Sequence, residues 1–158
     1  MFKKSDNSLV SLGIGKKVII EKWLDEMGVK NYIINDDYTI DVENNVDLDK
    51  KNLIKFPDYI QFNKVNGNFY CAENKLISLK GCPKIVSGRF HCDTNKLTSL
   101  YGCPEIIDKN FYCFSNQLIS LDGCPKKVGG NFSCNNNIKQ FTREDVREVC
   151  EVTYYIHV

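Results

Sequence analysis

One short pattern recurs through the middle of the chain at a constant spacing of 21 residues. The complete copies are GNFYCAENKLISLKGCPKIVS from Gly67, GRFHCDTNKLTSLYGCPEIID from Gly88 and KNFYCFSNQLISLDGCPKKVG from Lys109, and a truncated copy, GNFSCNNNIKQF, begins at Gly130. A constant period of this length is typical of solenoids, in which each unit buries its apolar face against its neighbours. The repeat therefore predicts a stack of similar coils, a scaffold that commonly binds other macromolecules.

Charge and hydrophobicity exclude several kinds of partner. The 158 residues carry 21 Lys and Arg against 20 Asp and Glu, a net charge of +1, so no overall field would attract nucleic acid or an anionic membrane. No apolar run approaches the roughly 20 residues that span a bilayer, and the residues after Met1 do not form a signal-peptide core. We expect a soluble cytoplasmic protein of one domain that binds neither nucleic acid nor membranes.

The segment before the repeats has the pattern of a cap. Between residues 16 and 27 apolar residues recur at helical spacing, and Gly28 follows as the glycine that ends the last turn. Residues 31–42 place two short β-prone runs around a polar turn, which predicts a β-hairpin. Residues 1–45 would thus form an N-terminal cap that covers the apolar end of the stack.

The solenoid is expected over residues 46–141. Its first coil, residues 46–66, matches the repeat loosely, with Val46 and Leu48 displaced by 23 residues from Phe69 and Cys71. Terminal repeats are commonly degenerate in this way because one of their sides meets a cap.

Residues 142–158 are expected to form a C-terminal cap. Thr142 is followed three positions later by Asp145, a pattern that begins a helix. The β-prone residues 152–158 either add a final strand over the last coil or fray.

Positions that repeat in every copy are assigned to the interior. The alternation of Phe69, Tyr70 and Cys71 predicts a strand with one buried face, and stacked copies would form a parallel sheet. The aliphatic columns are Leu76, Leu97, Leu118 and Ile138, then Leu79, Leu100, Leu121 and Phe141, then Val65, Val86, Ile107 and Val128. Each Gly-Cys-Pro sequence is assigned to a turn that directs the chain back along the opposite side.

Seven of the eight cysteines fall in two repeat columns. These are Cys71, Cys92, Cys113 and Cys134, and Cys82, Cys103 and Cys124. Each column would occupy one position repeated along the stack, where a thiol packs as a small apolar side chain. Disulfides or metal sites are the alternative, but no CxxC pair occurs. We expect reduced structural cysteines, with no metal and no cofactor.

A further column, three residues after each strand Cys, consists of Asn74, Asn95, Asn116 and Asn137. An inward amide side chain can pair with backbone groups left free where a strand bends away. We interpret this column as a structural Asn ladder.

The string F-x-C-x-x-N-x-L-x-x-L with a following Gly-Cys-Pro resembles the leucine-rich repeat motif L-x-x-L-x-L-x-x-N-x-L. The Pro turn resembles the short repeats of bacterial effector proteins, and the cap followed by repeats is similar to small leucine-rich-repeat-like proteins of bacteriophages and bacteria. The resemblance implies an α/β solenoid with a curved, stacked parallel β-sheet whose concave side binds protein. One departure is that the apolar residue before the strand, such as Val65, stands one position earlier than in the family.

The outward strand positions differ from copy to copy. If Phe69 and Cys71 point inward, their neighbours point outward and line up along the stack. The candidate protein-binding face comprises Tyr70, Arg89, His91, Asp93, Tyr112 and Phe114. Tyr and Arg are frequent in interface hot spots, but aromatic residues also favour strands in general.

We predict no enzymatic activity. His91 and Cys92 are the only adjacent base and nucleophile, and neighbours on a strand face opposite sides. The prediction is a non-enzymatic protein-binding module in the cytoplasm of a bacterium or phage-infected host, which modulates or inhibits a host protein. It would be a monomer or weak homo-oligomer, and a structural or self-assembling module is the alternative.

Overall fold

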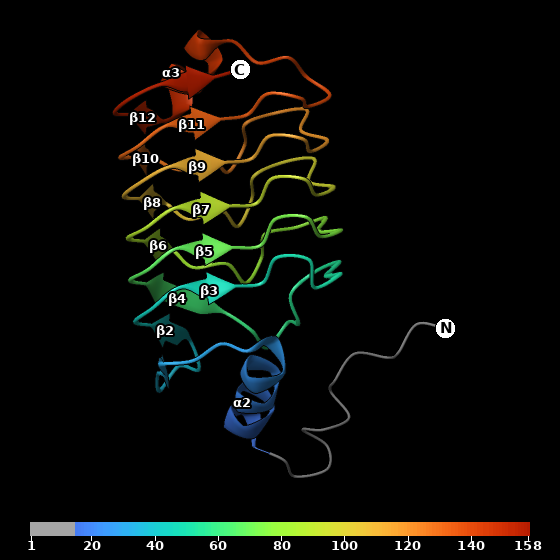
Figure 1. The fold of residues 1–158 in the computed structure, drawn as a ribbon, viewed down its shortest axis with the longest axis vertical. Coiled ribbons are helices and arrows are strands. Elements are labelled where there is room, and N and C mark those ends of the chain that lie inside the picture. The colour runs from blue at the N-terminus through green and yellow to red at the C-terminus, as the bar shows by residue number, and fades with distance from the viewer. Residues whose placement is uncertain (1–14) are drawn as a thin grey trace.

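A computed structural model describes residues 15–158, which wind into a solenoid of stacked coils (Figure 1). Helix α2 (Lys16–Met27) covers one end of the stack and helix α3 (Arg143–Val149) lies at the other. The predicted solenoid of stacked parallel strands, with a helix and hairpin at its N-terminal end and a short helix at its C-terminal end, is confirmed. The expectation that no signal peptide follows Met1 concerns residues outside the described range.

Each coil contributes one short strand to each of two sheets, A and B. Sheet A contains β1 (Tyr32–Ile34), β2 (Ile40–Val42), β4 (Phe62–Val65), β6 (Ile85–Val86), β8 (Ile106–Ile107), β10 (Lys127–Val128) and β12 (Glu151–Val152). Sheet B contains β3 (Val46–Asp47), β5 (Phe69–Tyr70), β7 (Phe90–His91), β9 (Phe111–Tyr112), β11 (Phe132–Ser133) and β13 (Ile156–His157). Within each sheet the strands follow this order in space, and all neighbours are parallel except β1 and β2.

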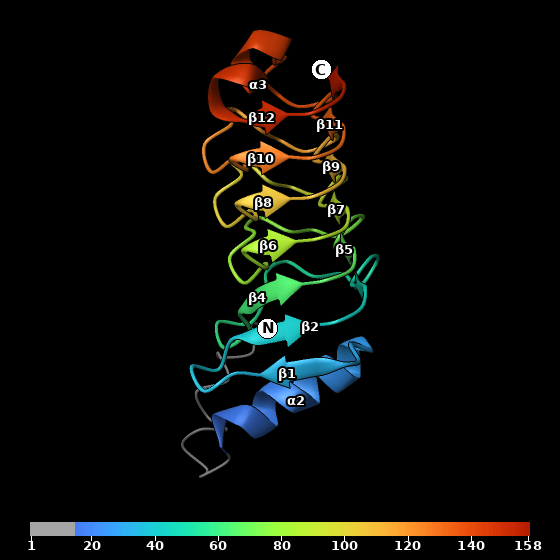
Figure 2. The same ribbon diagram turned by 90° about the vertical axis from the view of Figure 1, so that its left-hand side faces the viewer.

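Sheet A explains why the repeat departs from the leucine-rich pattern. Its strands β6, β8 and β10 follow the Gly-Cys-Pro turns, and the inward residues of the sheet are those placed one position early, such as Val65 and Val86. Because strands of both sheets stack at the same spacing, neither side of a coil is wider, and the coils form a straight column (Figures 1 and 2). The expectation of a concave face is therefore wrong: the outer face of sheet B is an open side of the column.

The interior is filled by the repeat columns. Phe69, Phe90, Phe111 and Phe132 are fully buried, and neighbouring ring centroids lie 5.6, 5.8 and 4.9 Å apart. One expected core residue is misplaced, since Ile138 is 67% exposed. Ile138 directly follows Asn137, whereas the buried Leu76 stands two residues after Asn74, so Ile138 does not belong to the buried aliphatic column.

The N-terminal cap closes the first coil. Trp23 of α2 packs edge-on against Phe56 and Phe62, with ring centroids 6.2 and 6.4 Å apart. The hairpin pairs Tyr32 with Val42, and its second strand then joins sheet A through β4 (Figure 2). The cap thus supplies both an apolar cover and a paired strand to the end of the stack.

At the other end, the side chain of Thr142 accepts a hydrogen bond from the Asp145 backbone, and Asp145 accepts one from the Thr142 backbone. After α3, the last residues add β12 to sheet A and β13 to sheet B, so the C-terminal segment forms two strands. Neither helix within residues 15–158 has the length and apolar character needed to cross a membrane.

Candidate protein-binding face

Four aromatic side chains form a ladder on the outer face of sheet B. Tyr70, His91 and Tyr112 occupy the same position on β5, β7 and β9, and each is half-buried. Ring centroids lie 5.0 Å apart between Tyr70 and His91 and 4.4 Å apart between His91 and Tyr112. Phe114 stands edge-on to Tyr112 at 6.2 Å. The structure therefore brings four of the six predicted face residues into one continuous aromatic ladder.

Asparagines beside the ladder connect neighbouring coils, and one of them orients the Tyr112 side chain. Nδ2 of Asn110 donates a hydrogen bond of 2.7 Å to the hydroxyl of Tyr112, while its Oδ1 accepts one from the Asn131 backbone in the next coil. Asn68 likewise accepts a hydrogen bond from the backbone of Arg89, whose side chain is exposed. The bridging role of these asparagines was not predicted, although their spacing of 42 residues, twice the repeat period, is a signal that could have shown it.

The burial of Asp93 is the largest difference from the sequence-based expectation, which placed this residue on the exposed binding face. Asp93 is 8% exposed and not a freely accessible flank of the aromatic ladder. Its Oδ1 lies 3.5 Å from Nδ1 of His91, but the geometry does not make a hydrogen bond, and neither this oxygen nor Nε2 of His91 has a hydrogen-bond partner in residues 15–158. A buried polar atom without a partner is costly, so this part of the face has unused hydrogen-bonding capacity.

A second carboxylate, Asp49, occupies the equivalent position two coils closer to the N-terminus. Oδ1 of Asp49 accepts a hydrogen bond of 2.7 Å from the Ala72 backbone. Burial raises the pKa of Asp49 above its ordinary value, and the negative charges of Asp47 and Asp93 act in the same direction. The hydrogen bond from Ala72 and the proximity of His91 oppose that shift. Asp47 and Asp49 are absent from the predicted face because the first coil is displaced from the strict repeat.

The Asn ladder lies at the corner after sheet B. The side chain of Asn95 donates hydrogen bonds to the carbonyl groups of Cys71 and Cys92, and its oxygen accepts one from the Leu76 backbone. Asn74, Asn116 and Asn137 make the equivalent bonds in their own coils. Each amide therefore joins neighbouring coils through otherwise unpaired backbone groups.

All eight cysteines are free thiols. Burial raises the pKa of Cys82, Cys92, Cys103 and Cys113 well above the ordinary value, and raises that of Cys134 to about 12. Cys92 points into the interior while His91 lies on the outer face, so the two side chains do not meet. Within residues 15–158, no three His, Cys, Asp or Glu side chains are grouped so as to hold a metal ion.

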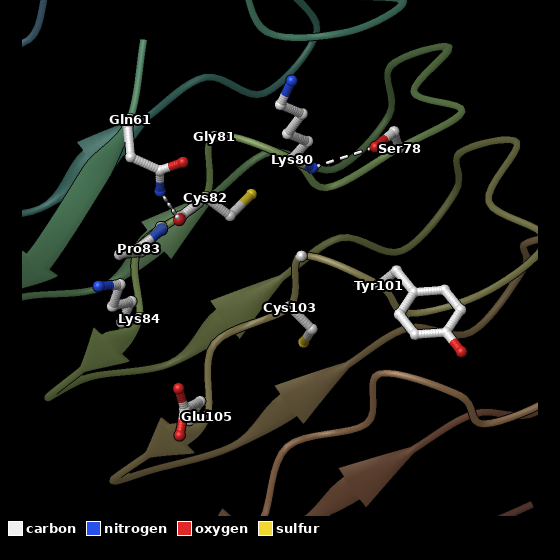
Figure 3. Close-up of a pocket in the computed structure, with 11 residues that line it drawn as sticks. Gln61, Ser78, Lys80, Gly81, Cys82, Pro83, Lys84, Tyr101, Cys103 and Glu105 are labelled. Carbon is white, nitrogen blue, oxygen red and sulfur yellow. Dashed lines mark hydrogen bonds between the residues drawn. The ribbon is translucent and has the colours of Figure 1, made fainter. Parts of the chain in front are cut away.

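A shallow pocket of about 360 Å³ lies where the Gly-Cys-Pro turns of two coils meet (Figure 3). Lys80, Lys84 and Glu105 bring charge to its rim, and Nε2 of Gln61 donates a hydrogen bond to the Cys82 carbonyl. Its two thiols, Cys82 and Cys103, have raised pKa values because they are buried. The pocket therefore presents neutral thiols and no activated nucleophile.

Exposed isoleucines form another column at the corner between the Asn ladder and the Gly-Cys-Pro turns. Ile54, Ile77 and Ile119 are 55%, 58% and 61% exposed, and Thr98 takes the same position in the coil between Ile77 and Ile119. This column was not predicted from the repeat. It offers an apolar surface separate from the aromatic ladder.

Comparison with known proteins finds no matching family model, no matching curated protein and no matching solved structure. The fold and the face together define the class: a capped, two-sheet β-solenoid that carries an aromatic and acidic ladder along one side.

Proposed function

We propose that this chain is a non-enzymatic protein-binding module that contacts its partner through the outer face of sheet B. The observation that carries the proposal is the stacked ladder of Tyr70, His91 and Tyr112, half-exposed on consecutive strands. Aromatic side chains held in place before binding lose little conformational freedom on association, which favours affinity.

The kind of partner is proposed from the sequence resemblance. Short repeats similar to leucine-rich repeats of bacterial effectors, and a cap similar to small bacteriophage and bacterial proteins, support a modulator or inhibitor of a host protein. Such a protein would act in the bacterial cytoplasm, including that of a phage-infected cell. This choice of partner rests on the similarity of the repeats and cap to those proteins, and it does not depend on the aromatic ladder.

The test begins with a pull-down from bacterial lysate and identification of the captured protein by mass spectrometry. Tyr70, Tyr112 and Phe114 are then replaced together by Ala, and the affinity for the purified partner is measured by calorimetry. Loss of three hot-spot aromatic residues should weaken binding by about 100-fold or more.

The chain offers a matched control. Replacing Ile54, Ile77 and Ile119 by Ala removes a similar exposed apolar surface from another side of the column, and should leave the affinity within about twofold. Both variants must retain the circular dichroism spectrum of the unmodified protein. Unchanged affinity in the folded aromatic variant would contradict the assignment of the binding face.

A self-assembling module is the second candidate, and the C-terminal end of the stack favours it. Tyr154 and Tyr155 are 68% and 71% exposed beside β13, the last strand of sheet B. Apolar side chains next to a terminal strand are a common site of association. Sedimentation velocity at micromolar concentration separates the candidates: a single monomeric species rejects self-assembly, whereas a dimer abolished by Tyr154→Ser and Tyr155→Ser supports it.

A further inference from the structure

Cys150 is the one cysteine outside the repeat columns, and it meets a repeat cysteine at the C-terminal end of the stack. It directly precedes β12, in which Glu151 pairs with Lys127 of β10, and Cys124 stands three residues before Lys127 in the last Gly-Cys-Pro turn. The side chains of Cys124 and Cys150 are hydrogen-bonded to each other. Cys150 therefore continues the column of turn cysteines from the last complete repeat into the C-terminal cap.

This pair differs from another thiol contact in the interior. Cys71 and Cys82 are also hydrogen-bonded through their side chains, but they are only 0% and 3% exposed, and burial raises the pKa of Cys82. Cys124, in contrast, is partly exposed. A small oxidant can therefore reach the contact between Cys124 and Cys150 from solvent, whereas it cannot reach the contact in the interior.

The surroundings of the pair assign different roles to its two sulfur atoms. The hydrogen bond from Cys124 lowers the pKa of Cys150, and a hydrogen bond from the Val128 backbone acts in the same direction, against the opposing effects of burial and of Glu151. The same contact, together with burial, raises the pKa of Cys124. Because the thiolate is the nucleophilic form of cysteine, Cys150 is the group that attacks an oxidant, and Cys124 is the neighbouring thiol.

We propose that Cys124 and Cys150 form a reversible disulfide when the protein meets hydrogen peroxide, and that this bond fastens the C-terminal cap to the last complete coil. The Cys150 thiolate attacks one oxygen of the peroxide, the O–O bond breaks, and the departing hydroxide takes up a proton to become water. Cys124 then loses its proton and attacks the sulfur of the Cys150 sulfenic acid, which expels a second water. The two thiols together lose two electrons and two protons, and the peroxide is reduced to two molecules of water.

The bond would stabilise the end of the stack. It closes a loop that contains β10, β11 and α3, and such a loop restricts the unfolded chain more than the folded one. Val146 and Ile156 of the cap are buried over the last coil, so the disulfide would keep this apolar cover in place. The inference is independent of the proposed binding face, because neither cysteine belongs to the outer face of sheet B.

The test treats reduced protein with a small molar excess of hydrogen peroxide, removes the excess with catalase and counts thiols in denaturant. The count should fall from eight to six, and dithiothreitol should restore it. Proteolysis followed by tandem mass spectrometry should identify a peptide in which Cys124 is joined to Cys150. The oxidised protein should melt about 5 °C or more above the reduced protein.

Two variants test the assignment of the pair. Cys124→Ser removes the second thiol, so it should form no disulfide and should leave a sulfenic acid at Cys150 that dimedone traps. Cys103→Ser is the matched control, because Cys103 lies one coil away in the same column and is likewise partly exposed, and it should form the disulfide normally.

Eight thiols remaining after peroxide treatment, a disulfide that joins any other pair, or an unchanged loss of thiols in folded Cys124→Ser would each overturn the proposal. If Cys124→Ser does not fold, the cross-linked peptide from the unmodified protein decides the question, since it identifies the two cysteines directly.

Discussion

The side-chain amide of Asn95 donates a hydrogen bond of 2.9 Å to the carbonyl oxygen of Cys71, which belongs to the preceding coil. The oxygen of the same side chain accepts a hydrogen bond from the Leu76 backbone, also at 2.9 Å. Asn95 is almost fully buried, so water is not available to replace these bonds. The amide therefore couples two coils at the corner where the backbone leaves sheet B and its own pairing is interrupted.

Replacing Asn95 by Ala should lower the free energy of unfolding by about 3 kcal/mol, because buried carbonyl and N–H groups of two coils lose their partners. Urea unfolding followed by circular dichroism measures the effect. Lys96→Ala, at the exposed neighbouring position, is the control and should change stability by less than about 0.5 kcal/mol. A loss in Asn95→Ala no larger than in the control would show that the ladder does not hold the coils together.

Thr94 occupies a backbone conformation that suits few residues. Its φ angle is 54°, in the left-handed region, where a β-branched side chain is strained. Asn tolerates this region better, so Thr94→Asn should raise the free energy of unfolding by about 0.5–1 kcal/mol. Thr98, exposed and outside this region, provides the control: Thr98→Asn should not raise the melting temperature. Destabilisation by Thr94→Asn would mean that the threonine makes a compensating contact.

The stack could be predicted from the sequence because constant columns such as Phe69, Phe90 and Phe111 repeat with a fixed period and need burial. The repeated strands of sheet A could not, because each of them, such as Ile85–Val86, places a single inward residue in the core, whereas in sheet B an inward Phe and an inward Cys flank each outward residue. The aromatic ladder followed directly from strand geometry. The burial of Asp93 did not, since it depends on how neighbouring side chains of adjacent coils cover the carboxylate.

The buried thiols make stability sensitive to alkaline pH. Burial raises the pKa of Cys82, Cys92, Cys103 and Cys113, and of Cys134 to about 12, whereas thiols of the unfolded chain ionise near pH 8.5. Above that pH the folded protein keeps protons that the unfolded chain has lost, so the free energy of unfolding falls as pH rises. The stability contributed by protonated thiols is complete below about pH 8 and declines through pH 9.5.

Each such thiol contributes a slope of up to about 1.4 kcal/mol per pH unit in this window. Urea unfolding at pH 7.5, 8.5 and 9.5 measures the combined slope, and Cys92→Ala should reduce it by the share of one thiol. A free energy of unfolding that is constant up to pH 9.5 would contradict the raised pKa values.

Trp23 is the only tryptophan of the chain and packs against Phe56 and Phe62 in the N-terminal cap, so its fluorescence reports on that end of the stack. Phe69 contacts both of these phenylalanines, whereas Phe111 lies two coils further along the Phe column. In a solenoid each coil interacts only with its neighbours, so a defect should act most strongly on the coils beside it.

Phe69→Ala and Phe111→Ala should each cost about 3–5 kcal/mol, since both rings are fully buried in equivalent positions. Their effects on the cap should nevertheless differ. Phe69→Ala should lower the urea midpoint of Trp23 fluorescence at least as much as that of circular dichroism, because it removes the ring that supports the cap. Phe111→Ala should lower the circular dichroism midpoint more than the fluorescence midpoint, since the cap and first coils can persist after the C-terminal coils unfold. Identical, coincident midpoints in both variants would show instead that the whole column unfolds as a single cooperative unit, with the caps and coils coupled from end to end.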